Sequence, residues 1–297
     1  MGVVETLLEA REAFERRDWV ATYQRLSDLN SAALRGDDFA RLAAAAYLTG
    51  RDNDCVQALQ RAYQAHLDNG KPLAAVRCAF WLAQTLTTMG ESAVAGGWLS
   101  RMQRLLDQTP GHVAEQGYLQ ILLMFRHLSL GEFSEAAECA ATVTACGRRF
   151  DDPDLLAVGL SSQGRLALYL GRVPDGLALL DEAMLGIVAG SVSTIFAGQV
   201  YCSMIEACQE ISDFSRAAEW TMALTRWCDE QPGLVTFTGQ CAVHRGQIMR
   251  VRCCYPEALQ EFSLAVHRYL AAGTAGPAGV ALTERGDVLR TLGNLDA

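Results

Sequence analysis

The cysteines are the side chains of this 297-residue chain with the most reactive chemistry, and there are ten of them. They form no C-x-x-C pair, and they do not cluster with histidine at the spacing of a zinc site. Cys253 and Cys254 are adjacent and could form a redox-active pair, but small reduced core thiols are the simpler interpretation. No secretory signal precedes them, since the N-terminus is charged from Glu5 onward. We therefore expect a cytoplasmic protein.

Two other groups of residues could carry chemistry. His244 follows Cys241 by three positions, which would allow a Cys/His nucleophile, although a packed or surface histidine is the default. Asp151, Asp152 and Asp154 could bind a metal ion, but no further oxygen ligands follow at a suitable spacing. We expect these aspartates to cap a helix, and we predict no metal site.

Motifs of the common enzyme classes are missing from the sequence. It contains no G-x-x-x-x-G-K-[ST], H-E-x-x-H or G-x-S-x-G. The glycine-rich stretch at 273–279 lacks the dinucleotide-binding spacing, and we interpret it as a loop. The sequence therefore predicts a protein that is not an enzyme and that uses no cofactor.

Composition narrows the class further. Half of the residues are hydrophobic, so the chain can bury a core, and 34 acidic against 25 basic residues give a net charge of -9. Phosphate binding needs clustered positive charge, so we expect no nucleic acid to bind through this segment. Residues 183–205 are uncharged, but they are rich in glycine, serine and threonine. We expect no membrane span there.

An internal repeat organises the whole chain. A glycine-like break, an apolar residue two positions later and a small residue three after that recur, most clearly in GEFSEAAECA at 131–140. The breaks fall at positions 17, 50, 90, 131, 171, 212, 253 and 293, so the period is about 40 residues after a shorter first step.

Each unit has the pattern of two helices joined at the break. Apolar residues recur at helical spacing on both sides of it, as in Phe39, Leu42, Ala43 and Ala46. Five residues after each break, every complete unit keeps a small side chain, which would allow two helices to cross closely. These residues are Thr22, Cys55, Ala95, Ala136, Gly176, Ala217 and Ala258.

The repeat resembles the tetratricopeptide repeat. Phe39-x2-Leu42-Ala43-x2-Ala46 followed by Cys55-x3-Leu59 matches that outline, and Ala258-x3-Phe262 is the best match in a second helix. The period is longer than the usual 34 residues, so a HEAT-type repeat remains the alternative. The resemblance implies an all-α fold, a right-handed α-solenoid of tetratricopeptide-like helix pairs. We expect a single solenoid over residues 1–297, with about seven and a half units.

In such arrays the first helices line a concave surface that binds ligands or peptides. Counting back from each break gives the lining positions, which in the middle units are mainly aromatic, amide and isolated charged residues. The candidate binding residues are Phe80, Gln84, Ile121, Phe125, Arg165, Tyr169, Cys202, Glu206, Gln209, Gln247 and Arg250. They suit a neutral or zwitterionic ligand, or a peptide, better than a polyanion.

A second resemblance concerns the amino-acid sequence of several stretches. LALLDEAM, VYCSMIEACQE and LTRWCDEQPGLVTFTGQC are similar to the repeat region of actinobacterial LuxR-type, maltose-activator-like transcriptional regulators. That resemblance implies a sensor or scaffold solenoid that precedes a DNA-binding domain and takes a peptide, a protein or a small-molecule inducer in its groove. A stand-alone protein–protein interaction adaptor is the alternative.

The end of the sequence also bears on this choice. The eighth unit stops at Ala297, and its first helix would have no second helix to pack against. We therefore expect the chain to be a fragment of a longer protein, and we regard homo-oligomerisation through that helix as possible.

Overall fold

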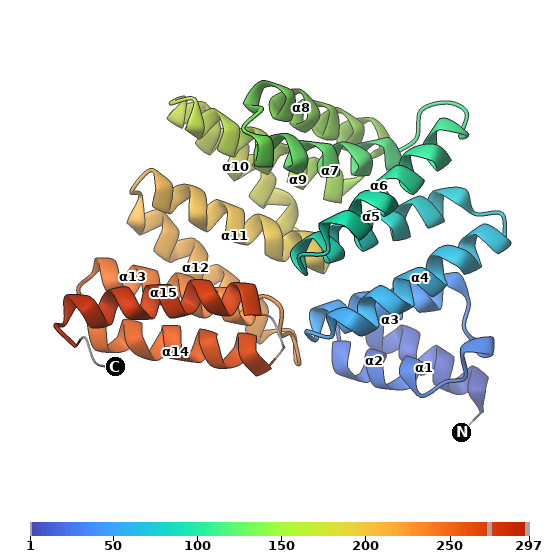
Figure 1. The fold of residues 1–297 in the computed structure, drawn as a ribbon, viewed down its shortest axis with the longest axis horizontal. Helices are drawn as coiled ribbons and strands as arrows, with labels where there is room; N and C mark the ends of the chain where they lie inside the picture. Colours follow the sequence, from blue (N-terminus) through green and yellow to red (C-terminus); the bar gives the residue numbers. More distant parts are fainter. Residues whose placement is uncertain (1, 272–274, 295–297) are drawn as a thin grey trace.

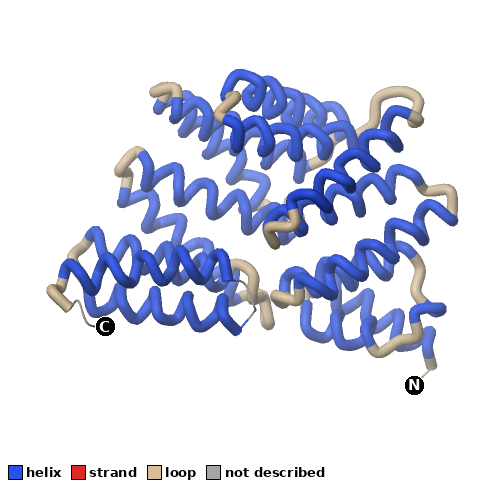
Figure 2. The backbone as a smooth tube through the Cα atoms, viewed as in Figure 1, coloured by secondary structure: helices blue, strands red, loops and turns tan. Residues whose placement is uncertain are grey.

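The computed structural model describes residues 2–271 and 275–294. These residues form fifteen α-helices and one short 3-10 helix, Ser31–Ala33, and no strand (Figures 1 and 2). The α-helices are α1 (Val3–Glu15), α2 (Trp19–Ser27), α3 (Gly36–Leu48), α4 (Asp52–Asp68), α5 (Pro72–Thr88), α6 (Ser92–Asp107), α7 (Glu115–Leu130), α8 (Phe133–Phe150), α9 (Pro153–Tyr169), α10 (Val173–Val188), α11 (Thr194–Glu210), α12 (Phe214–Asp229), α13 (Thr238–Val251), α14 (Tyr255–Ala271) and α15 (Ala275–Thr291).

The predicted register of the repeat is confirmed at every break. All eight break positions have positive φ, from 59° at Cys253 to 85° at Gly90. The first seven lie between the two helices of a unit, and Gly293 follows α15. A left-handed residue ends a helix and turns the chain sharply, which explains why five of the eight are glycine. The first step of the repeat is shorter because α2 has 9 residues, whereas α4 has 17.

The small residues lie where the helices of a unit cross. All seven second-helix positions are buried. Gly164 on α9 and Gly176 on α10 meet directly, because a Cβ built on Gly164 would lie 2.8 Å from the carbonyl oxygen of Gly176. In the last unit Gly286 has open space around it instead. Close packing of each pair therefore follows from the sequence pattern, as expected for an α-solenoid.

One sequence interpretation was wrong at the start of the last helix. Residues 275–279 were expected to form a loop, but they form the first turn of α15, and residues 273–274 lie outside the described residues. Proline is compatible with this place, because the first helical turn needs no intrahelical amide donor there and Pro277 lies in it.

The solenoid curves until its two halves touch. The helix pairs follow an arc that brings the loop between α12 and α13 to the end of α3 (Figure 1). The amide of Val235 donates to the carbonyl oxygen of Leu48 over 2.8 Å, and the hydroxyl of Thr236 donates to the backbone carbonyl oxygen of Tyr47. The amide of Thr236 also donates to the carbonyl oxygen of Leu48, at 3.4 Å. We call these three hydrogen bonds the latch. They make one ring out of a fold whose other contacts join mainly neighbouring helices.

An aromatic cluster packs between α5, α7 and α11 on the inside of the ring. Phe80 and Trp81 of α5 contact Phe196 of α11, with ring centroids 6.0 and 4.9 Å apart, and Tyr118 of α7 packs edge-on against Phe80 at 5.2 Å. One connected apolar core therefore extends from Trp19 to Ile248.

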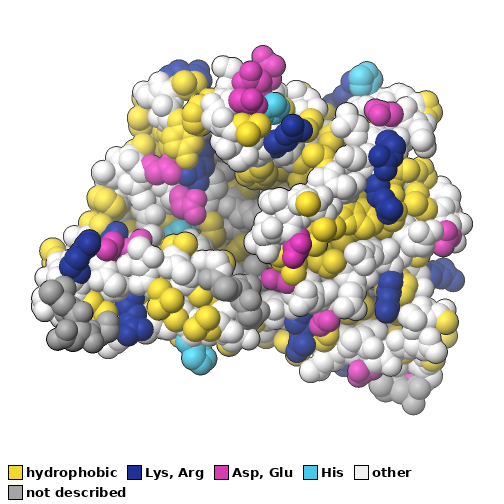
Figure 3. Space-filling view, in the orientation of Figure 1, with side chains coloured by type: hydrophobic (Ala, Val, Ile, Leu, Met, Phe, Trp, Pro, Cys, Tyr) yellow, Lys and Arg dark blue, Asp and Glu magenta, His cyan; other side chains and the backbone are white. Residues whose placement is uncertain are grey.

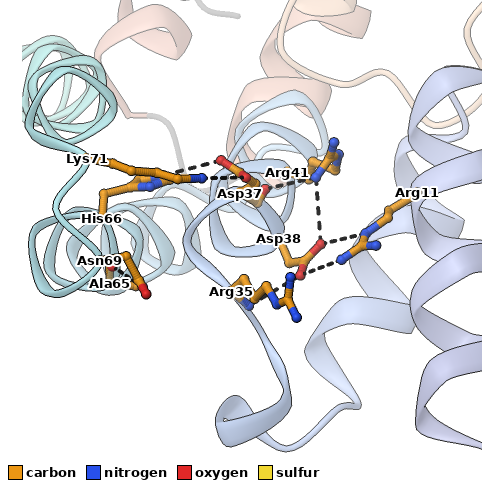
Figure 4. A network of polar contacts seen from close by, with 9 residues as sticks. All are labelled: Arg11, Arg35, Asp37, Asp38, Arg41, Ala65, His66, Asn69 and Lys71. Atoms are coloured by element: carbon orange, nitrogen blue, oxygen red, sulfur yellow. Dashed lines mark hydrogen bonds and ion pairs between the residues drawn. The ribbon is translucent and has the colours of Figure 1, made fainter.

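Buried charge ties the first units together (Figure 4). Asp38 is fully buried at the start of α3, and its carboxylate accepts from Nε and Nη2 of Arg11 at 2.9 and 3.0 Å. The backbone amide of Arg35 also donates to this carboxylate at 3.2 Å, and Nη1 of Arg41 lies 3.6 Å from its Oδ1. Because a buried carboxylate is stable only when its oxygens are paired, this contact fixes the crossing of α1 and α3.

Candidate functional site

A cavity of about 540 Å³ opens at the centre of the ring. The molecule is hollowed there, between α5 on one side and α11, α13 and α15 on the other, in Figure 3. Its wall is built from the inner faces of first helices and from the segment that follows the latch. A volume of this order is typical of sites for small ligands.

The charged part of the wall centres on Arg165 of α9. Its guanidinium donates to Oε2 of Glu206 at 2.6 Å, to the hydroxyl of Tyr169 at 2.9 Å, and to Oε1 of Glu210. Burial by itself would lower the pKa of Arg165, but the hydrogen bond and the charge of Glu206 raise it overall, so the side chain remains a cation. Both carboxylates come from α11, so the cluster also links two units.

A ladder of polar side chains continues along the next first helices. Gln209 of α11 donates to Gln247 of α13 at 3.0 Å, and Gln247 donates to Glu284 of α15 at 2.8 Å. Arg250 pairs with Glu284 at 2.6 Å and lies 3.9 Å from Asp287. The inner face of the last units is therefore held by side chains that satisfy one another.

The structure divides the eleven candidate binding residues into three groups. Six line the cavity, three belong to the polar ladder, and two are core residues. The cavity group is Gln84, Phe125, Arg165, Tyr169, Cys202 and Glu206, the ladder group is Gln209, Gln247 and Arg250, and the core group is Phe80 and Ile121.

The core group corrects the sequence prediction. Phe80 and Ile121 are both fully buried. Phe80 was expected to face an open groove, but Phe196 and Tyr118 cover its ring because the solenoid closes across it. The lining rule assumes an open arc, and it fails where distant units meet.

Gln84 is the least satisfied member of the wall. Its Oε1 atom is buried and has no hydrogen-bond partner among the described residues. A buried amide oxygen without a donor is costly, so this position is suited to a hydrogen-bond donor from a ligand or a water molecule.

Sequence reasoning missed the part of the wall that comes from other elements. Thr236 and Phe237 lie at the end of the α12–α13 loop, Tyr269 is on a second helix, and Pro277 is at the start of α15. No repeat position marks them. They reach the cavity only because the ring closes.

His244 and Cys241, which the sequence places three positions apart, each contact other side chains in the structure. His244 is buried, and burial lowers the pKa of its imidazole. Its Nε2 atom lies 3.3 Å from Nε2 of Gln240, and its Nδ1 atom lies 3.4 Å from Oε1 of Gln247. The Sγ atom of Cys241 lies 3.3 Å from that of Cys228. The described residues contain no group of three or more potential metal ligands.

Of the three aspartates expected to cap a helix, only Asp152 caps the start of one, while Asp151 follows the end of α8 with a φ of 52°. Oδ1 of Asp152 accepts from the amide of Leu155 at 3.1 Å, which caps α9 as predicted. Asp152 also pairs with Arg77 at 3.2 Å, and Asp154 accepts from the amide of Ser193 at 2.7 Å.

No helix among the described residues is long and apolar enough to cross a membrane.

Comparison with known proteins supports the fold and little more. Neither the family models nor the curated proteins contain a match to this sequence. Among solved structures, the chain is similar to a signal-transduction ATPase with numerous domains that carries a tetratricopeptide-repeat sensor, from Pyrococcus horikoshii. The TM-score is 0.52 at 12% identity, over 92% of this chain and 44% of that one. This chain therefore spans less than half the length of that protein.

A second solved structure is a Rap protein in complex with competence and sporulation factor. Its TM-score is also 0.52, at 11% identity, over 98% of this chain and 75% of that one. At these low identities, the two TM-scores establish the fold alone, which is an α-solenoid of the tetratricopeptide type.

Proposed function

We propose that this chain is the ligand-binding sensor solenoid of a LuxR-type transcriptional regulator, and that its ligand is a peptide or a small molecule held in the central cavity. The observation that carries the proposal is the composition of the cavity wall. It combines exposed rings, an amide oxygen without a partner and charged side chains, and it draws them from both halves of a closed ring. Folded proteins seldom leave such a wall without a use.

The ring suggests how binding would be transmitted. A ligand that contacts Phe125 on one side and Phe237 on the other would change the spacing of units that the latch holds together. Binding would then favour one curvature of the solenoid over another, and a domain attached to it would be presented differently. Similarity to one solenoid described as a tetratricopeptide-repeat sensor, and to a Rap protein solved in complex with a factor, supports this proposal.

Ligand binding is tested by a thermal-shift screen of short peptides and metabolites against the wild-type chain and Phe125→Ala. Phe125 is half-exposed, so its truncation should leave the melting temperature nearly unchanged while weakening any true ligand. Ligands that stabilise both proteins equally would contradict the cavity as the site.

The regulator role needs a separate test in a protein that carries this solenoid together with a DNA-binding domain. Full-length protein and protein lacking residues 1–297 would be compared in a DNA-binding titration, with and without ligand. Identical DNA binding by both, at every ligand concentration, would exclude a sensory role.

One observation favours the adaptor alternative. Leu282 and Gly286 of α15 occupy the positions of Ala242 and Gly246 on α13, which pack against α14, but Leu282 and Gly286 are exposed. A helix from a protein partner or from a second copy could cover this face. Light scattering across a concentration series would show self-association, and Leu282→Glu should abolish it.

A further inference from the structure

Carboxylates outnumber arginines in the cluster around Arg165 on the inner face. Arg165 is paired with Glu206 and Glu210, and Arg250 is paired with Glu284 and lies close to Asp287. Two carboxylates thus face Arg165, and this cluster carries a net negative charge, whereas Asp287 also pairs with Arg290 at 2.9 Å, so the charges around Arg250 balance.

Arg165 has little capacity left for a ligand anion. Its side chain is 19% exposed, and both terminal nitrogens are already engaged, one by Glu206 and the other by Glu210 and Tyr169. An incoming carboxylate or phosphate would have to displace a carboxylate of the protein itself. It would also meet the remaining negative charge at short range.

The two carboxylates, in contrast, keep capacity for a cation. Glu206 and Glu210 are 42% and 38% exposed, and each meets Arg165 through a single oxygen. The second oxygen of each has no other partner among the described residues. A guanidinium or ammonium group could take both oxygens in charge-assisted hydrogen bonds.

Aromatic rings stand beside these carboxylates. Phe125 and Tyr169, which are 48% and 53% exposed, line the cavity together with Glu206, and the hydroxyl of Tyr169 lies 3.3 Å from Oε1 of Glu210. Arg165 already lies 5.8 Å from the centroid of the Tyr169 ring, so a cation is accommodated at this ring in the free protein. An aromatic face together with a carboxylate is a favourable environment for a partly desolvated cation.

We propose that the cavity selects ligands that carry a guanidinium or ammonium group next to an apolar portion, such as a short peptide with an arginine side chain. This inference rests on the proposed function, because it assigns the chemical class of the ligand to the same cavity. The cation would lie against Glu206 and Glu210, and the apolar portion would lie against Phe125. A volume of about 540 Å³ accommodates a few residues of such a peptide.

The test uses a panel of end-capped pentapeptides that differ only at the central residue, which is arginine, its neutral isostere citrulline, or glutamate. Affinities are measured by calorimetry with the whole chain at low and moderate salt. We expect arginine peptides to bind about tenfold or more tightly than their citrulline counterparts, and the difference to shrink with added salt.

Three variants locate the effect. Glu206→Gln with Glu210→Gln should lower the affinity for arginine peptides about tenfold and leave citrulline peptides unchanged. Phe125→Ala should weaken both kinds of peptide. Glu182→Gln is the matched control, because Glu182 of α10 is also a half-exposed carboxylate paired with an arginine, Arg148, but belongs neither to the cavity wall nor to the Arg165 cluster.

The outcomes separate this inference from the proposed function. If arginine and citrulline peptides bind equally and Phe125→Ala weakens both, the cation preference is wrong and the cavity remains the ligand site. If binding is insensitive to Phe125→Ala, both proposals fail. A preference for glutamate peptides, or no binding by any arginine peptide at millimolar concentration, overturns the assignment of a cationic ligand.

Discussion

Gly164 and Gly176 face each other so closely that neither has room for a methyl group. A Cβ on Gly164 would lie 2.8 Å from the carbonyl oxygen of Gly176, and a Cβ on Gly176 would lie 2.7 Å from that of Gly164. The contact is reciprocal and involves backbone on both sides, so no side chain can rotate away. The α9–α10 pair therefore depends on glycine at both positions.

This relationship predicts a stability effect of Gly164→Ala. Alanine is the better helix former, but here its methyl group would push two helix backbones apart. We expect a loss of about 1–3 kcal/mol in the free energy of unfolding, measured by urea denaturation followed by circular dichroism.

Gly96→Ala provides the matched control for this measurement. Gly96 is also inside a helix, α6, but it has open space around it, so the same substitution should be neutral or stabilising by up to about 1 kcal/mol. Equal effects at the two glycines would contradict close packing of α9 on α10.

The buried carboxylate of Asp38 predicts a dependence of stability on pH. Burial by itself would raise the pKa of Asp38, but the hydrogen bond from Arg11 and the amide of Arg35 lower it overall. A depressed pKa means that the carboxylate stabilises the fold fully above its unfolded value of about 3.9, and that this contribution is lost as the pH falls through the folded pKa.

Asp38→Asn should therefore cost about 1–3 kcal/mol at neutral pH, and the difference from wild type should narrow below about pH 4. Denaturation at a series of pH values measures both. Asp28→Asn, at an exposed position that follows α2, should show neither effect. A gap between wild type and Asp38→Asn that stays constant down to pH 2 would contradict the role of ionised Asp38.

The thiols predict a two-class reaction with a colorimetric thiol reagent. Cys253 and Cys254 are exposed, whereas burial raises the pKa of Cys55 and Cys78 to about 12 and that of Cys208 to about 11. Since the thiolate is the reacting form, native protein should show a fast phase of two thiols per chain. Cys253→Ser with Cys254→Ser should remove that phase, and a fast phase that survives would show that buried thiols are reachable.

The positions of the breaks and of the helix crossings could be predicted from sequence because both depend on local pattern. A left-handed residue and a small residue five positions later constrain the chain within one unit, as the breaks at Gly131 and Gly171 illustrate. The closure of the ring could not be predicted. Thr236 and Tyr47 are 189 positions apart, and no periodic residue type marks either of them.

The same distinction applies to the site. The lining rule placed Phe125 and Tyr169 at the cavity because their surroundings depend only on adjacent units. It misplaced Phe80, whose surroundings include Phe196 from a distant unit. The shape of the cavity wall depends on these long-range contacts, so a substitution at the latch tests them.

Thr236→Val removes the hydroxyl that donates to the backbone carbonyl oxygen of Tyr47 and keeps the shape of the side chain. Because the ring is closed by very few hydrogen bonds, we expect faster opening of the α12–α13 loop while the helices remain folded. Hydrogen exchange at the amide of Val235, which is bonded to Leu48, should accelerate roughly 2- to 10-fold, the equivalent of one hydrogen bond. Thr142→Val, which removes a hydroxyl bonded within its own helix α8, should leave this amide unchanged. Unchanged exchange at Val235 in Thr236→Val, or equal acceleration throughout the chain, would mean that the latch does not hold the ring closed.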